Sequence, residues 1–143
     1  MTRVVLDVNV IVSGFPIPNS VPGTLVRMGL EERYDLVVSE HIVQGAVRAW
    51  RKPYFRTRFD EERADASVQL LRQAGIFVEP EFVAGIAPDL EDDLILGTAL
   101  AGGANYLVTG DRGLLQLHAH REVLIISPQE FLAVLAGASV SSS

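Results

Sequence analysis

Short apolar runs alternate along the chain with longer segments in which apolar residues recur every three or four positions. The short runs predict five strands, at residues 3–8, 34–38, 76–79, 105–109 and 122–127. The longer segments predict six helices, at about residues 22–32, 40–51, 60–74, 92–103, 112–117 and 127–137. Because strands that alternate with helices favour a parallel sheet, this pattern predicts an α/β fold: a single three-layer α/β/α domain with a five-stranded, mainly parallel sheet.

Residues at the predicted helix ends support these boundaries. Ser39 lies where a side-chain cap is expected, and Pro53 stops the same helix. Gly75 follows the helix that begins at Asp60, at a position where a left-handed cap is expected. "SPQE", from Ser127 onward, combines a capping serine, a proline in the first turn and a glutamate that completes a capping box.

The length and composition describe an ordinary globular chain. Its 143 residues suffice for one domain, which we assign to residues 1–137, and we expect the "ASVSSS" tail at 138–143 to be disordered. The chain has no cysteine, which excludes disulfides and thiolate metal sites. It also has no apolar run near the roughly 18 residues that cross a membrane, and no signal-peptide pattern. We therefore expect a soluble, cytoplasmic protein that does not bind membranes.

The charge is unevenly distributed. A net charge of −6 argues against a nucleic-acid partner, but the segment "VRAWRKPYFRTRF" contains no acid. Its basic residues are Arg48, Arg51, Lys52, Arg56 and Arg58, and its aromatic residues are Trp50, Tyr54, Phe55 and Phe59. Two interpretations stand side by side: a solvated helix end whose aromatic residues enter the core, or a basic surface on which RNA bases stack.

Aspartates follow the first and fourth predicted strands and open the helix before the fourth. Asp7 ends "VVLD", Asp111 follows Thr109 in "LVTGDRGLL", and Asp92 and Asp93 begin the helix. Because ligands bind at the carboxyl ends of parallel strands, these acids are expected at one rim of the sheet. Clustered carboxylates repel one another unless a cation neutralises them, and oxygen ligands suit Mg²⁺ or Mn²⁺. Such an ion orients a water and stabilises charge on a phosphate.

Each acid taken alone also has a purely structural explanation. Asp7 can cap the turn that follows it, and "TGD" is a common turn sequence. Asp92 and Asp93 suit the first turn of a helix, with Asp89 as its N-cap. The combination is more specific, since three separate segments bring acids to one predicted rim.

Other α/β chemistries lack their signatures here. A haloacid-dehalogenase phosphatase needs a second aspartate where this chain has Asn9, and a receiver domain needs a lysine where it has Ser127. The sequence also contains no phosphate-binding P-loop.

These residues resemble the PIN-domain family of metal-dependent ribonucleases over nearly the whole chain. The matching segments are "VVLDVNVIVSG", "LVVSEHIVQGAVRAWRKPYF", "APDLEDDLILGTALAGGANYLVTGDRGLL" and "VLIISPQEFLAVL". Within the family the chain is most similar to toxin components of toxin–antitoxin pairs, the VapC-like group. The resemblance implies an endoribonuclease that cleaves single-stranded RNA with Mg²⁺ or Mn²⁺ held by four acids. It also implies a homodimer and a cognate antitoxin.

Position by position, the resemblance assigns roles to individual residues. Asp7, Asp92 and Asp111 are the expected catalytic acids and metal ligands, and Asp93 is a further candidate ligand beside Asp92. The expected supporting residues are Asn9, Ser13, Ser39 and Thr109, of which Asn9 and Thr109 orient the acids. The basic segment is the expected guide for RNA.

One position departs from the family pattern. Where the family has a glutamate six residues after the serine, this chain has Gly45. Of the nearby polar residues, Glu40 and Gln44 lie at different angles around the helix, whereas His41 lies on the same face one turn earlier. The departure leaves two functions open: a ribonuclease with a three-acid site, or a catalytically weakened module that binds RNA or an antitoxin.

Overall fold

A six-stranded sheet forms the centre of the computed structural model, which describes residues 1–83, 85 and 90–137. The strands are β1 (Arg3–Leu6), β2 (Asp35–Val38), β3 (Ile76–Phe77), β4 (Tyr106–Val108), β5 (Ala119–His120) and β6 (Val123–Ile126). Their order is β3-β2-β1-β4-β6-β5, and every neighbouring pair is parallel except β5 and β6. The predicted α/β class is confirmed, and the five predicted strands correspond to β1, β2, β3, β4 and β6. The short antiparallel β5 is an addition, since two residues carry too little pattern to predict.

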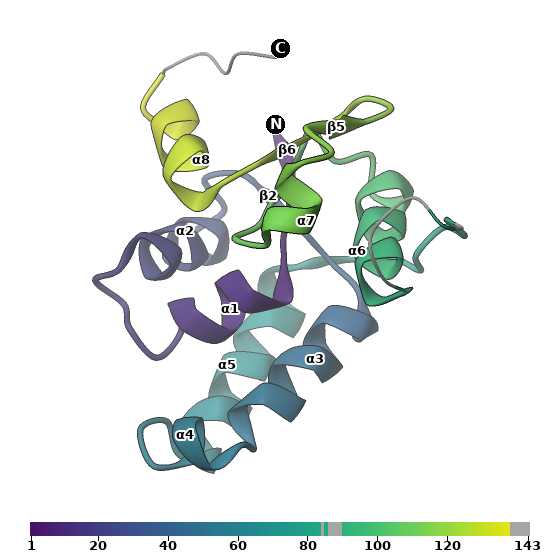
Figure 1. Cartoon of the computed structure of the whole chain (residues 1–143). Coiled ribbons are helices and arrows are strands. Elements are labelled where there is room, and N and C mark those ends of the chain that lie inside the picture. The colour runs from purple at the N-terminus through teal and green to yellow at the C-terminus, as the bar shows by residue number, and fades with distance from the viewer. Residues whose placement is uncertain (84, 86–89, 138–143) are drawn as a thin grey trace.

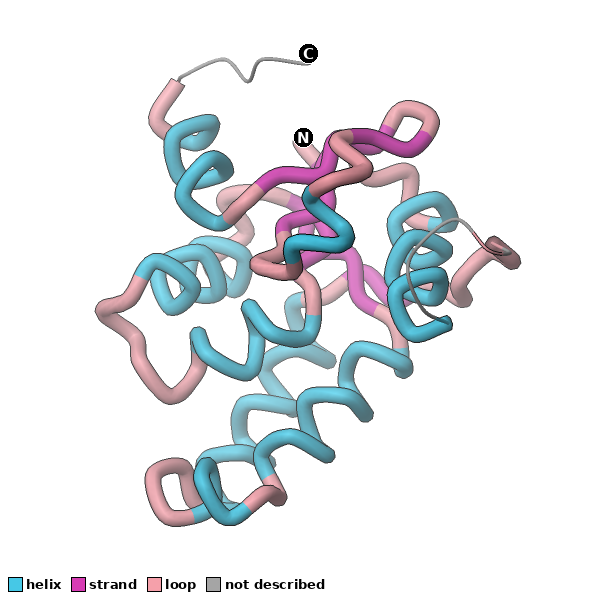
Figure 2. Tube along the Cα trace, viewed as in Figure 1, coloured by secondary structure: helices cyan, strands magenta, loops and turns pink. Residues whose placement is uncertain are grey.

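Eight helices accompany the sheet in the described part of the chain. They are α1 (Val8–Gly14), α2 (Val21–Leu30), α3 (Glu40–Trp50), α4 (Pro53–Arg56), α5 (Glu61–Ala74), α6 (Leu90–Ala101), α7 (Arg112–Leu115) and α8 (Pro128–Leu135). Figure 1 shows α1, α2 and α8 on one side of the strands and α6 on the other, and Figure 2 shows the strands between them. Helix α6 packs against β1, β2 and β4, while α2 contacts α1, α5 and α8. Among the described residues, no helix combines the length and apolarity that crossing a membrane requires.

The chain reverses its direction of travel across the sheet between β1 and β4. From β1 it proceeds outward to β2 and β3, and then α6 returns it to β4, on the opposite flank of β1. Leu6 pairs with Val108, and the Asp7 backbone N–H donates to the Val108 carbonyl at 2.9 Å. The residues that follow β1 and β4 therefore meet at a topological switch point, where parallel α/β sheets bind ligands.

The structure differs from what the sequence predicts at three places. Residues 8–14 form helix α1 directly after β1, although their run of β-branched residues gives no helical signal. Gly75 ends α5 in an extended conformation with a φ of −78°, not in a left-handed cap. Ser39 occupies the N-cap position of α3 but makes no capping hydrogen bond, because its buried hydroxyl accepts a hydrogen bond from Thr98 at 3.0 Å.

Other predictions concern helix starts. The capping box at Ser127 and Glu130 is present, and Asp60 caps α5. The predicted helix before β4 extends further toward the N-terminus than expected and includes Leu90 and Glu91. Asp89, the predicted cap of that helix, and the predicted tail at 138–143 lie outside the described residues.

The aromatic residues of the basic segment divide between core and surface. Trp50 is 1% exposed, packs against Phe15 and Phe59, and donates its indole N–H to the Val12 carbonyl at 3.2 Å. Tyr54, by contrast, is 62% exposed. Burial of Trp50 and Phe59 therefore anchors the end of α3 to α1, as the core interpretation expects, and leaves Tyr54 at the surface.

Candidate active site

A pocket of about 600 Å³ lies beside the switch point and receives acids from three segments. Asp7 follows β1, Asp92 lies in the first turns of α6, and Asp111 precedes α7. The pocket is also lined by Val8, Asn9, Val12, His41, Gly45, Arg48, Ala49, Lys52, Glu91 and Ile95. The three aspartates predicted to converge at one rim thus line a single pocket.

Asp7 is the most enclosed of these acids, with a residue exposure of 6%. Its Oδ1 accepts the backbone N–H of Val8 at 2.7 Å, which caps α1. Its Oδ2 accepts the Thr109 hydroxyl at 2.7 Å and the Asn9 side-chain amide at 3.2 Å. Burying a carboxylate is costly unless donors surround it, and here both oxygens receive hydrogen bonds.

The same donors connect Asp7 to the loop that carries Asp111. The Asp111 N–H donates to the Thr109 hydroxyl at 3.0 Å, and the Gly110 N–H donates to the Asn9 side-chain carbonyl at 3.4 Å. Asp111 in turn accepts the Leu114 N–H through Oδ2 at 3.0 Å and so caps α7. Hydrogen bonds through Thr109 and Asn9 therefore hold the two strand-end acids in a fixed relation. Asp7 and Asp111 each also have a structural role, since Asp7 caps α1 and Asp111 caps α7.

The pKa of Asp7 is raised above its ordinary value. Burial of the carboxylate is the largest cause, opposed by the hydrogen bonds from Thr109 and Val8. The negative charge of Asp111 raises the pKa further, and the nearby His41 lowers it. The pocket thus disfavours a negative charge on Asp7, which is the condition that a bound cation relieves.

One face of α3 forms a wall of the pocket through His41, Gly45 and Arg48, and Lys52 adds to this wall from just beyond the end of the helix. A Cβ added to Gly45 would lie 3.1 and 3.2 Å from the Val8 methyl groups, so Val8 occupies the space beside this glycine. The sequence correctly placed His41 and Gly45 on the same face. The sequence analysis assigned no role to Glu91, which also lines the pocket. Its position next to Asp92 and Asp93 in "EDD" could have indicated this.

Among the predicted acids and supporting residues, Asp93, Ser13, Ser39 and Thr109 do not line this pocket, and Thr109 lies buried behind Asp7. Asp93 is buried and accepts the Gly85 N–H at 3.1 Å. Ser39 is fully buried against Thr98, and Ser13 lines a separate hollow next to Asn9. A serine near the start of a helix that follows a strand can point into the core, into the pocket or toward another surface. The spacing of residues in the sequence does not distinguish these directions.

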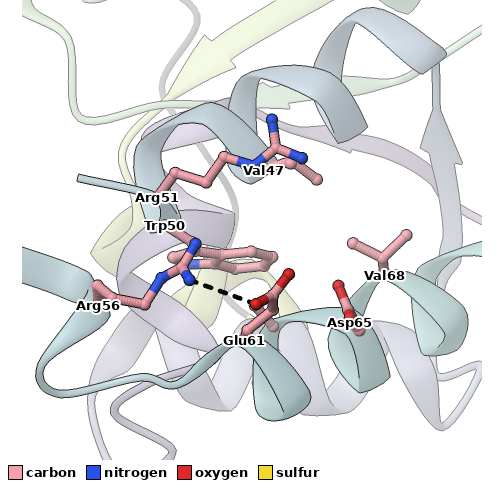
Figure 3. A pocket seen from close by; sticks show the side chains of 8 residues that line it. Val47, Trp50, Arg51, Arg56, Glu61, Asp65 and Val68 are labelled. Atoms are coloured by element: carbon pink, nitrogen blue, oxygen red, sulfur yellow. Dashed lines mark hydrogen bonds and ion pairs between the residues drawn. The ribbon is translucent and has the colours of Figure 1, made fainter. Parts of the chain in front are cut away.

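The five basic residues predicted to guide RNA point in different directions. Arg48 and Lys52 line the acidic pocket, and Arg48 lies 3.9 Å from Glu91 in an exposed ion pair. Arg51 and Arg56 line a small cavity between the end of α3, α4 and α5, as Figure 3 shows. The cavity has a volume of about 30 Å³ and is also lined by Trp50. Arg56 pairs there with Glu61 of α5 at 3.5 Å. Arg58 covers the Tyr54 ring at 4.0 Å. Only part of the basic segment therefore faces the acids.

The donor set matches a hard divalent cation in chemistry, because carboxylate oxygens are the ligands such ions prefer. Within the described ranges, no three acidic or histidine side chains stand close enough together to enclose an ion as they are placed. Mg²⁺ commonly retains several waters and needs only one or two carboxylates, so an incomplete acid shell is compatible with it. Asp7, Asp92 and Asp111 are the residues of the pocket that fit this group.

Comparison with known proteins identifies the family. A sequence model described as the PIN domain matches residues 3–113, which is more than half of the chain. The chain belongs to the PIN domain family. PIN domains are generally nucleases that use divalent metal ions, and the matched range contains all three aspartates of the pocket.

A distant relative extends the similarity beyond the PIN model. An uncharacterized protein of Methanocaldococcus jannaschii is 24% identical over 139 residues, covering 91% of this chain and 89% of the relative. The two chains are therefore of similar length.

The raised pKa of Asp7 predicts how stability depends on pH. Because the folded PIN domain binds a proton at Asp7 more tightly than the unfolded chain does, ionisation of Asp7 opposes folding. The penalty is absent below about pH 4, the ordinary carboxyl pKa, and develops fully as the pH rises through the raised pKa. Relative to Asp7→Asn, the wild-type free energy of unfolding should therefore fall as pH rises, in urea denaturation without divalent ions. A difference that stays level or rises with pH would contradict this assignment.

Proposed function

We propose that this PIN domain is an endoribonuclease that cleaves single-stranded RNA with Mg²⁺ or Mn²⁺. The observation that carries the proposal is the pocket at the switch point, in which Asp7, Asp92 and Asp111 come from three segments. The family makes a nuclease the expected activity, and the raised pKa of Asp7 indicates a site that favours a cation.

In this proposal the pocket residues have two roles, metal binding and orientation of the metal ligands. Asp7, Asp92 and Asp111 hold the ion, which when bound activates a water and stabilises charge on the phosphate. Thr109 and Asn9 fix the orientation of Asp7 through their hydrogen bonds, as outer-shell donors do at metal sites. We treat Asp93, whose carboxylate bonds to Gly85, as a positioning residue of α6 and not as a ligand.

Arg48 and Lys52 are the residues we propose to bind the RNA backbone. Both are exposed cations that line the acidic pocket, in a chain whose net charge is −6. Arg48 is paired only loosely with Glu91, at 3.9 Å, and exposed pairs of this kind contribute little. Phosphate can therefore replace Glu91 as the partner of Arg48 at small cost. Arg51, Arg56 and Arg58 have other neighbours and contribute long-range attraction.

The biological role we propose is that of a VapC-like toxin, active in the cytoplasm as a homodimer and restrained by a cognate antitoxin. Support for this comes from the similarity of the sequence motifs to that group. A small adjacent reading frame whose product forms a complex with the chain and suppresses its activity would establish the role.

Gly45 favours a second candidate function, a PIN domain that binds RNA or an antitoxin without cleaving. Gly45 lines the acidic pocket and brings no carboxylate to it, and Val8 fills the adjoining space. We favour the nuclease because three aspartates from separate segments line the pocket, and two of them, Asp7 and Asp111, are held by specific hydrogen bonds.

Cleavage of a labelled single-stranded RNA with Mn²⁺ tests the nuclease directly. EDTA should abolish cleavage, and Asp7→Asn, Asp92→Asn and Asp111→Asn should each reduce kcat/KM by about 100-fold or more, because outer-shell changes alone cost roughly 10- to 100-fold. Asp65→Asn, which removes an exposed acid of α5 outside this pocket, is the matched control and should retain activity. Cleavage that is indifferent to EDTA and to all three variants would refute the proposal.

Restoring the carboxylate at position 45 distinguishes the two candidate functions. Gly45→Glu supplies a further carboxylate to the pocket, and Val8→Ala in the same chain removes the methyl groups that a Cβ at position 45 would press against. For a weak nuclease we expect cleavage to rise by about tenfold or more over the Val8→Ala control, since an added ligand strengthens metal binding. Cleavage absent from the wild type and restored in the double variant would favour the binding module.

A further inference from the structure

A second hollow adjoins the acidic pocket and shares two lining residues with it. It has a volume of about 470 Å³ and is open to solvent, and both hollows are lined by Asn9 and Asp111. These two residues therefore border both hollows, and we call the pair the Asn9–Asp111 ridge. Roughly 300–1,000 Å³ is the usual size of a small-ligand site.

The second hollow differs from the first in chemistry. Its other lining residues are Val10, Ser13, Pro22, Gly110 and Pro128, none of which is charged. The acidic pocket, in contrast, carries Arg48 and Lys52 on its wall. A phosphodiester could pair with Arg48 and Lys52 in the acidic pocket. In the second hollow it would contact two prolines, a valine and the carboxylate of Asp111, and no cation. The second hollow thus suits the uncharged part of a nucleotide.

Ser13 supplies the polar contact that such a ligand needs. Ser13 lies on α1 and is partly exposed, and its hydroxyl makes no hydrogen bond to any of the described residues. The other hydroxyl beside the ridge, that of Thr109, is fully buried and engaged by Asp7 and Asp111. Ser13 is therefore the hydroxyl in this hollow that remains able to donate to or accept from a ligand.

We propose that the hollow formed by Ser13, Pro22 and Pro128 is a nucleoside subsite. It would take the base and ribose of the nucleotide that adjoins the phosphate held over the Asn9–Asp111 ridge. Apolar side chains pack against the face of any base, while the Ser13 hydroxyl can bond to a base edge or to a ribose hydroxyl. The inference rests on the proposed nuclease and extends it, because it changes Ser13 from a supporting residue to one that contacts substrate.

Amide NMR of the ¹⁵N-labelled chain tests the subsite without requiring cleavage. Adenosine, cytidine, guanosine and uridine carry no phosphate, and at least one should shift the amides of Val10, Ser13 and Gly110. Inorganic phosphate should instead shift the amides of Arg48 and Lys52. Ser13→Phe, which fills the hollow, should abolish the nucleoside shifts, whereas Gln69→Phe, which adds the same bulk to an exposed position of α5, should leave them unchanged.

Kinetics on a short RNA provide the second readout. Ser13→Ala should raise KM by about threefold to tenfold, the effect of losing one neutral hydrogen bond, with kcat nearly unchanged. Nucleoside shifts elsewhere, or shifts at the hollow that persist in folded Ser13→Phe, would overturn the subsite even if RNA is cleaved. Nucleoside shifts at the hollow together with no cleavage by the wild type would support the subsite and refute the nuclease.

Discussion

The buried carboxylate of Asp7 and the Thr109 hydroxyl that donates to it form the interaction on which the site depends. Asp7 follows β1 and Thr109 follows β4, so their 2.7 Å hydrogen bond joins the two strands between which the chain reverses its direction across the sheet. The Thr109 hydroxyl also accepts the N–H of Asp111. One buried hydroxyl therefore fixes both strand-end acids, and the strand register that aligns Leu6 with Val108 determines where they lie.

Structure and chemistry are combined in the same side chains at this rim. Asp7 caps α1 and Asp111 caps α7, and each uses a carboxylate oxygen to do so. Such caps stabilise the helices, but burial raises the pKa of Asp7 and thereby opposes its charge. A bound cation would relieve both the cost of burying the Asp7 charge and the repulsion between Asp7 and Asp111, which is why we propose a cation at this site.

Much of this arrangement could be predicted from the sequence, because apolar runs ending in Asp7 and Thr109 define parallel strands and their carboxyl ends. The meeting of Asp7, Asp92 and Asp111 in one pocket follows from that topology. Helix α1 could not be predicted, since its β-branched residues fit a strand equally well and tertiary packing decides between the two. The directions of the Asp93 and Ser13 side chains could not be predicted from the sequence either. Neighbouring positions on a helix point about 100° apart, so an error of one position places a side chain on a different surface.

Carboxyl-selective ¹³C NMR during a Mg²⁺ titration shows whether Asp7, Asp92 and Asp111 bind a single divalent ion. We expect the side-chain carboxyl signals of these three aspartates to shift together along one binding curve, while those of Asp60, which caps α5, and of Asp65 within α5 stay in place. Signals that do not move, or shifts of similar size at Asp60 and Asp65, would contradict this expectation.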